Sequence, residues 1–441
     1  MIKDLVKNGK KYYDHNKMER NQILNYREKK FRKLIKLAYE KSEFYRELYE
    51  NKGIKYKDLD CISIEDLPII NKDLVRDNSY NILTKNINEE KVKQSIKKDS
   101  LLPKVGDNYI IHTSGTTGIP CNFFYHKSAL NILESNFARL SLLGDNKFTV
   151  SDFPIKSLYI APVGSGYASS ALANFGLKEY HCKSIIINAK SPMNTWIDKI
   201  VNYNPLYLSG YPSCIDLLAS LQEQGKINIH PKKIITGGEP LSKENTLYYK
   251  KIFDADVVDQ YGCTESILIG AGSSEYEGMY LFDDLNYVEV DNKNRLIITP
   301  LYNPLFPLIR YQLTDVLEGY DDSGKYKLPY THIDRVIGRE EEMMWFCNIK
   351  GEVDFLHPMF LDDLSVLGIE KYQFIQRDKE SFTILCVKNS DFSDKTIKNT
   401  REQLEKFLEY KDMNNVKYDI IFVDEIKADN KTGKTKLVIK I

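Results

Sequence analysis

The chain has 441 residues, of which 42% are hydrophobic and 28% are charged. This length exceeds that of one ordinary domain, so we expect two or more domains with sizeable hydrophobic cores. The 62 basic and 62 acidic residues balance, which leaves no general basic field to hold nucleic acid, and no apolar run approaches the ~18 residues that cross a bilayer.

The N-terminus and the cysteines bear on the cellular compartment. Residues 1–20 lack the apolar core of a secretory signal. The seven cysteines are scattered and contain no CxxC pair, which argues against a disulfide framework and against a structural zinc site. We therefore expect a cytoplasmic protein.

The first part of the chain is expected to be helical. Apolar side chains recur near helical spacing over residues 17–53, and Gly53 is a plausible end for this region. From residue 100 to 340, short apolar runs alternate with segments of helix length. That alternation is typical of an α/β fold with a mainly parallel sheet. The expected strands are 108–113, 157–163, 184–189, 205–210, 233–238, 256–262 and 295–301, and the expected helices are 126–143, 192–203, 212–225 and 241–253.

The character of the sequence changes after residue 338. Strand-like runs at 371–376 and 381–388 precede a charged helix at 393–410, and another strand-like run follows at 418–423. We therefore expect a large α/β domain with mainly parallel strands at 1–337 and a small α+β domain at 338–441.

The segment HTSGTTGIP, residues 112–120, combines two glycines with several hydroxyl side chains directly after an expected strand. Glycines let backbone N–H groups approach a phosphate, and serine and threonine add donors. Since Ile-Pro-Cys follows Gly118, the segment is not a P-loop, which argues against a P-loop phosphotransferase. Three more polar loops that contain glycine, SGYPS, TGGEPLS and DQYGCTES, follow expected strands, where open α/β sheets bind ligands.

Taken together, these motifs resemble those of the adenylate-forming superfamily, and the resemblance covers residues 112–437. TSGTTGIP resembles its phosphate loop. Further matching motifs follow in the same order: GGEPLS (237–242), DQYGCTES (259–266), PLIRYQLTDV (307–316), IGREE (337–341) and NKTGKTKL (430–437). The nearest branch is the phenylacetate–coenzyme A ligase group with its capsule-locus relatives. That branch shares the chain length, the Gly-Glu-Pro motif and an N-terminal segment like SEFYRELYENKGI.

The resemblance implies that a carboxylic acid attacks the α-phosphate of ATP, giving an acyl-adenylate and pyrophosphate. Charge grows on phosphate oxygens in this step, so fixed donors and cations are needed. A thiol, with coenzyme A the first candidate, then takes the acyl group. Between the two steps the small domain would rotate about a hinge at Glu341.

The same resemblance implies a role for each motif residue. Lys434 would bridge the carboxylate and the α-phosphate, Thr264 would contact the α-phosphate, and Glu265 would bind Mg²⁺. Asp315 would accept from the ribose hydroxyls, and Arg339 would reach the ribose or a phosphate. The other expected nucleotide-binding residues are Thr113, Ser114, Gly115, Thr116, Thr117 and Gly118 at the phosphates, with Gly238, Glu239, Pro240, Asp259, Gln260, Tyr261 and Gly262 around the adenine.

The acid itself is not specified by the sequence, which leaves aromatic, aliphatic and amino acids open. The expected acid pocket is lined by Tyr167, Ser169, Tyr211, Cys214 and Gly237, and the alternative is that these aromatic side chains only pack in the core. Glu265 could equally be a solvated loop carboxylate, Tyr261 a core tyrosine and Lys434 one more lysine of a lysine-rich tail.

Two departures from the family pattern affect the acyl acceptor and the phosphate loop. The branch carries an Arg-Gly pair after the hinge, whereas here Lys350-Gly351 comes late. The acceptor could therefore be an amine, a sugar hydroxyl or a carrier-protein thiol instead of coenzyme A. Cys121 replaces a lysine common in the superfamily and is expected to be a small buried residue. A third hypothesis is a degenerate nucleotide-binding protein without catalysis.

Overall fold

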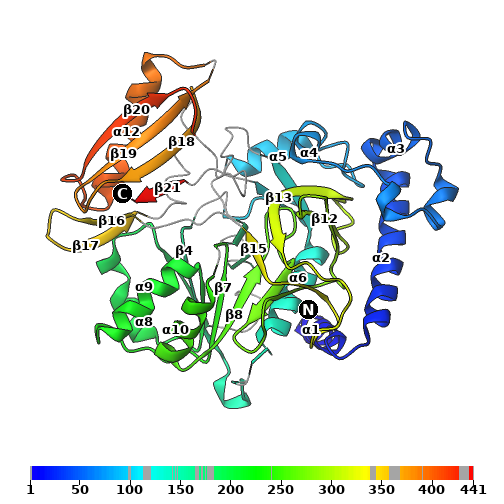
Figure 1. Ribbon diagram of the computed structural model, residues 1–441, viewed down its shortest axis with the longest axis horizontal. Helices are drawn as coiled ribbons and strands as arrows, with labels where there is room; N and C mark the ends of the chain where they lie inside the picture. Colours follow the sequence, from blue (N-terminus) through cyan, green and yellow to red (C-terminus); the bar gives the residue numbers. More distant parts are fainter. Residues whose placement is uncertain are drawn as a thin grey trace.

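The structure is a computed structural model that describes residues 2–97, 101–112, 121–141, 143–144, 146, 148–163, 168–169, 172–173, 175, 183–239, 241–337, 344–356, 368–389, 391–426 and 437–440. Figure 1 shows a large body built around one sheet and a smaller C-terminal unit beside it. Within the described ranges, no helix is both long and apolar enough to cross a membrane.

The N-terminal region is helical, as predicted, but it contains more than one helix. The predicted region, 17–53, divides into two helices at Ser42. The Ser42 hydroxyl accepts from the backbone N–H of Tyr45 and so caps the N-terminus of the helix at Glu43–Glu50. Gly53 lies beyond that helix with a left-handed φ of +76°. The first helix was not predicted. The helices of this region are α1 (Ile2–His15), α2 (Arg20–Lys41), α3 (Glu43–Glu50), α4 (Lys72–Asp77) and α5 (Glu89–Ile96).

The central sheet has eight strands in the order β14-β10-β9-β8-β7-β6-β4-β5. The run from β5 to β8 is parallel throughout, and β9, β10 and β14 continue it antiparallel. The predicted α/β class is therefore confirmed. The strands are β4 (Lys156–Ala161), β5 (Lys183–Asn188), β6 (Tyr207–Gly210), β7 (Lys233–Gly237), β8 (Asp256–Tyr261), β9 (Gly270–Ser273), β10 (Met279–Leu281) and β14 (Thr331–Ile333).

Helices cover both faces of this sheet. Two successive residues of one strand show this, because their side chains point to opposite faces. Ile234 of β7 packs in one hydrophobic cluster with Ile215 of α9, whereas the next residue, Ile235, packs in the other cluster with Leu133 of α6. Among the residues that the structure describes, the helices beside the sheet are α6 (Lys127–Ser141), α8 (Ile197–Tyr203), α9 (Pro212–Glu223) and α10 (Lys243–Phe253).

Two further sheets complete the large body, and both are antiparallel. The expected strands at 108–113 and 295–301 form, but they belong to these sheets and not to the parallel one. The first sheet contains β1 (Lys104–Val105), β2 (Asn108–His112) and β3 (Asn122–His126), and the second contains β11 (Asn286–Val290), β12 (Arg295–Pro300), β13 (Tyr311–Glu318) and β15 (Arg335–Ile337).

The C-terminal part has a hydrophobic core of its own. Phe374, Phe382 and Leu404 belong to a cluster whose buried members all lie between residues 344 and 438. A hairpin, β16 (Met344–Cys347) with β17 (Val353–Leu356), precedes a four-stranded sheet and, within the described ranges, one helix. These elements are β18 (Ile369–Gln376), β19 (Ser381–Lys388), α12 (Asp394–Tyr410), β20 (Lys417–Val423) and β21 (Val438–Lys440). Figure 1 shows this unit, in orange and red, beyond the β16–β17 hairpin.

A buried ion pair within the C-terminal part also contacts the large body. Lys411 and Asp354 lie 3.1 Å apart, with side chains 1% and 4% exposed. Lys411 Nζ also donates to the carbonyl of Ser191 at 3.3 Å, and Asp354 accepts from the backbone N–H of Met193 at 3.3 Å. Burial lowers the pKa of Lys411, and the nearby Asp354 opposes this shift.

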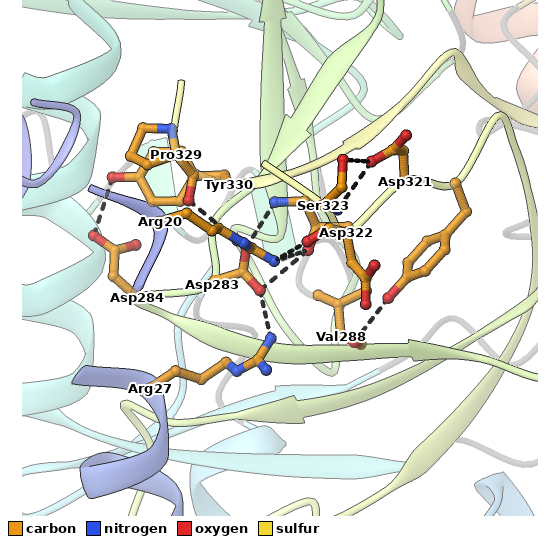
Figure 2. Close-up of polar contacts among 12 residues, drawn as sticks. Arg20, Arg27, Asp283, Asp284, Val288, Asp321, Asp322, Ser323, Pro329 and Tyr330 are labelled. Carbon is orange, nitrogen blue, oxygen red and sulfur yellow. Dashed lines mark hydrogen bonds and ion pairs between the residues drawn. The ribbon is translucent and has the colours of Figure 1, made fainter. Parts of the chain in front are cut away.

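Two adjacent aspartates after β10 anchor the N-terminal helices to the large body (Figure 2). Arg20 and Arg27 of α2 donate to the two oxygens of Asp283 at 2.5 and 2.7 Å, and the Asp283 side chain is fully buried. The neighbouring Asp284 accepts from Arg139 of α6 at 2.8 Å. Buried ion pairs thus connect helix α2, near the N-terminus, to the segment that follows β10.

Replacing Asp283 by alanine is expected to lower the free energy of unfolding by about 3–5 kcal/mol. The substitution leaves two largely buried arginines without their counter-ion, which costs more than the ion pair itself contributes. Urea unfolding measures the change. The matched control is Glu318→Ala, which breaks the exposed pair with Arg335 and should cost about 0–1 kcal/mol. Equal losses in the two variants would contradict a stabilising role for the buried cluster.

Candidate active site

Three of the predicted loops lie next to one another at the carboxyl edge of the parallel sheet. Gly210 at the end of β6 pairs with Thr236 of β7, and Gly237 at the end of β7 pairs with Gln260 of β8. The carboxyl ends of parallel strands are the usual ligand-binding edge. The structure therefore brings the loops SGYPS, TGGEPLS and DQYGCTES to one place, as predicted. The strand before TSGTTGIP is β2, in a different sheet.

Tyr261 and Asp315 meet although they are 54 residues apart. The Tyr261 hydroxyl donates to Asp315 Oδ2 at 2.9 Å, which connects β8 with β13. Burial raises the pKa of Tyr261, and the nearby Asp315 raises it further, so the phenol keeps the proton that it donates. The residue expected at the adenine and the one expected at the ribose thus form one unit.

Two tyrosines that the sequence analysis missed hold the Thr264–Glu265 segment. Tyr311, which is 1% exposed, donates to Glu265 Oε1 at 2.9 Å. Tyr125 of β3 donates to the backbone carbonyls of Thr264 and Glu265 at 2.7 and 3.0 Å. Glu265 is buried, not solvated, which removes the alternative of a solvated loop carboxylate.

The loop after β7 contacts the loop after β6. Glu239, expected beside the adenine, accepts from the backbone N–H and the hydroxyl of Ser213, both at 3.0 Å. Gly238 has φ +89°, and a Cβ there would lie 2.7 Å from the Tyr211 ring, so only glycine fits. These contacts place Gly238 and Glu239 against the first turn of α9.

The glycine of the Tyr-Gly motif is required by a close backbone approach. A Cβ on Gly262 would lie 2.1 Å from the carbonyl oxygen of Ile267. Gln260 Nε2 donates to the same carbonyl at 3.3 Å. Both residues therefore shape the turn that carries Thr264 and Glu265.

On the expected acid side, the Ser169 and Tyr211 hydroxyls lie 3.0 Å apart. Tyr211 is buried, and Gly237 approaches the next strand so closely that a Cβ on it would lie 2.9 Å from the carbonyl oxygen of Gln260. Cys214 is fully buried in the cluster between α9 and the sheet. Cys121 is buried as predicted, and burial raises its pKa to about 11.

Many expected site residues fall outside the part of the chain that the structure describes. They are Thr113, Ser114, Gly115, Thr116, Thr117, Gly118, Tyr167, Pro240, Arg339, Glu341 and Lys434. Their roles stay predictions from the motifs.

Asp259 is a half-buried carboxyl within β8 that accepts a hydrogen bond from the Thr236 hydroxyl at 2.8 Å. Burial raises its pKa to about 7, and the hydrogen bond from Thr236 opposes the shift. A raised carboxyl pKa means that the folded protein binds this proton more tightly than the unfolded chain does. The resulting stability is fully present below about pH 4 and is lost as the pH rises towards 7.

Replacing Asp259 by asparagine should remove this pH dependence. We expect the stability difference between variant and wild type to shift in favour of the variant by roughly 2 kcal/mol from pH 5 to pH 7, within the limit of about 1.4 kcal/mol per pH unit. Urea unfolding at both pH values measures it. A difference that stays constant with pH would show that Asp259 does not titrate in this window.

Two protein families match parts of this chain. The AMP-binding enzyme family matches residues 61–280, and the CapK C-terminal domain matches residues 360–440. Residues 61–280 thus form an AMP-binding enzyme domain. This confirms the adenylate-forming superfamily predicted from the motifs, and with it an AMP-forming ligase. Protein CapK of Staphylococcus aureus is 24% identical over 456 residues, covering 98% of this chain and 92% of that protein.

Solved structures of 2-hydroxyisobutyryl-CoA ligase share the fold of this chain. The chain is similar to 2-hydroxyisobutyryl-CoA ligase in complex with 2-HIB-AMP and CoA in the thioesterification state, with a TM-score of 0.61, 18% identity and coverage of 94% of this chain and 88% of that one. Its postadenylation state with 2-HIB-AMP gives a TM-score of 0.55 at 16% identity, covering 94% and 89%. At these identities the likeness establishes the fold alone.

Proposed function

We propose that this chain activates a carboxylic acid with ATP through an acyl-adenylate and then passes the acyl group to a thiol, with coenzyme A as the first candidate. The observation that carries the proposal is the carboxyl edge of the parallel sheet, where β6, β7 and β8 end side by side. Tyr261 at the end of β8 pairs with Asp315, and the buried Glu265 follows in the next loop. The AMP-binding enzyme domain supports the first step. The complex of the 2-hydroxyisobutyryl-CoA ligase with CoA supports the second.

The proposed chemistry assigns the nucleotide to this edge. Tyr261 stacks on the adenine while its hydroxyl orients Asp315, whose carboxylate accepts from the ribose hydroxyls. Thr264 donates to the α-phosphate, and Lys434 bridges that phosphate and the acid. A carboxylate is a poor acyl donor, and exchanging its oxygen for AMP gives it a good leaving group.

Mg²⁺ fits the donor set because a carboxylate oxygen is the hard ligand that it prefers, and protein Mg²⁺ sites commonly combine one or two carboxylates with substrate phosphates. Glu265 would hold the ion, and Tyr311 orients that carboxylate through its 2.9 Å hydrogen bond. When bound, the ion would neutralise charge on the phosphates.

The small unit is proposed to be a mobile domain, 338–441, that turns about Glu341. Support comes from its separate hydrophobic core, while the polar contacts cited above connect it to the large body at Ser191 and Met193. Turning would carry Lys434 away and admit the thiol.

A second candidate function is transfer to an amine, a sugar hydroxyl or a carrier-protein thiol. The observation in its favour is the turn between β16 and β17, where Lys350 pairs with Asp412 at 2.6 Å instead of presenting the Arg-Gly pair of the coenzyme A ligases. The relationship to the CapK C-terminal domain falls on the same unit.

Mass spectrometry of reaction mixtures tests the proposal and separates the two candidates. The protein is incubated with ATP and a panel of aromatic, aliphatic and amino acids, with and without coenzyme A. We expect AMP with one acid class, and an acyl-CoA only when coenzyme A is present. AMP and acyl-adenylate without any acyl-CoA would favour the second candidate, and no AMP with any acid would contradict both.

A further inference from the structure

The loops after β6 and β7 are joined by a carboxylate at the start of α9. Glu239 accepts from the Ser213 backbone N–H and from the Ser213 hydroxyl, each at 3.0 Å, so both of its oxygens are engaged. Ser213 lies in the first turn of this twelve-residue helix, where backbone N–H groups lack helical partners. A negative charge is stabilised there by those groups and by the helix dipole.

Tyr211 lies between this contact and the expected acid pocket. It directly precedes α9, is 4% exposed, and packs its ring against Gly238, the residue before Glu239. Its hydroxyl lies 3.0 Å from the Ser169 hydroxyl. The position of Tyr211 is therefore set by Gly238 on its ring and by the anchored first turn of α9 on its backbone.

We propose that Glu239 is a positioning residue for the carboxylic acid and not a nucleotide contact. This role rests on the proposed function and on the motif-based expectation that the loop after β7 faces the adenine while Tyr211 and Ser169 face the acid. By fixing the first turn of α9, Glu239 holds Tyr211 where the acid must bind. The adenine-side and acid-side loops then move as one unit.

The physical consequence is that removing the Glu239 carboxylate should affect binding of the acid but not binding of ATP. Loss of the Glu239 carboxylate frees the first turn of α9, and a displacement of about 1 Å in a substrate-positioning group is enough to lower reactivity strongly. The nucleotide keeps Tyr261 and Asp315, which are oriented by their own hydrogen bond at 2.9 Å. Acid binding should suffer while ATP binding does not.

The test compares Glu239→Ala, Glu239→Gln, Ser213→Ala and the double variant Glu239→Ala/Ser213→Ala. Acid-dependent ATP–pyrophosphate exchange gives KM for acid and for ATP, and calorimetry gives the Kd for ATP without acid. Glu239→Ala should raise the KM for the acid on the order of tenfold and leave the Kd for ATP within about twofold. Glu239→Gln, which keeps an acceptor oxygen, should recover part of the loss.

The double variant should be no worse than Glu239→Ala, because the two residues act through one contact. The matched control is Glu244→Ala, which removes an exposed carboxylate from the first turn of α10 and should change neither constant. A raised Kd for ATP with an unchanged KM for acid would overturn the inference, as would additive effects in the double variant. A wild type without exchange on any acid would overturn the proposed function and this inference with it.

Discussion

Replacing Lys434 by alanine should lower acid-dependent adenylation by a factor on the order of 10²–10³ or more, the loss typical when one donor to developing charge is removed. The expected reason is that its ammonium group bridges the attacking carboxylate and the α-phosphate. ATP–pyrophosphate exchange measures the rate, and calorimetry should find ATP binding nearly intact, because the other nucleotide-binding residues remain.

The control for Lys434 lies in the same tail. Lys431→Ala removes an equal charge three residues earlier and should leave the exchange rate unchanged. Equal activity in the Lys434 variant and the wild type would show that Lys434 is one more lysine of a lysine-rich segment. A large effect in both variants would point to the net charge of the tail and not to one catalytic group.

Removing the Glu265 carboxylate should raise the Mg²⁺ concentration needed for half-maximal exchange by about tenfold or more, since even outer-shell partners of a metal are worth 10–100-fold in affinity. A Mg²⁺ titration of Glu265→Ala and Glu265→Gln measures it. The glutamine variant keeps an oxygen that can accept from Tyr311, so it separates lost charge from the cost of a buried hydroxyl without a partner, about 1–3 kcal/mol.

Tyr311→Phe provides the matched comparison for Glu265. It removes the hydrogen bond at 2.9 Å but keeps the carboxylate, so its Mg²⁺ requirement should rise less than that of either Glu265 variant. If all the variants show the wild-type Mg²⁺ dependence, Glu265 does not bind the ion and its burial serves the fold alone.

The strand ends of the site could be predicted because local signals are strong there. Runs such as KIITGG and DVVDQYG combine β-branched residues with a following glycine, and both form adjacent parallel strands whose loops meet at one edge. The hydrophobic pattern predicts which segments form buried strands and where they lie along the chain. It does not fix which sheet a strand joins, and β2 and β12 therefore fell in antiparallel sheets.

Contacts between distant side chains could not be predicted. The Glu239–Ser213 contact joins residues 26 apart, and the hydrogen bond from Tyr311 to Glu265 joins residues 46 apart. Neither pair has a spacing that local structure imposes. Tyr311 lies inside the motif that was used to find Asp315, and this was the only local signal that could have drawn attention to it.

The N-terminal helix α1 was missed for a related reason. Its sequence, IKDLVKNGKKYYDH, has few apolar residues, and its partners lie far away in the chain. His15 at its end contacts Asp284 at 2.8 Å, and the carbonyl of Tyr12 accepts from Arg139 at 3.3 Å. Tertiary contacts of this kind stabilise a helix that local pattern alone does not specify.

The central claim is that this chain joins a carboxylic acid to AMP, and acid-dependent ATP–pyrophosphate exchange without any thiol tests it most directly. The exchange is measured over a panel of aromatic, aliphatic and amino acids at saturating Mg²⁺. We predict exchange with one class of acid and none without acid. Binding of ATP without exchange on any acid would contradict the claim and favour a nucleotide-binding protein without catalysis.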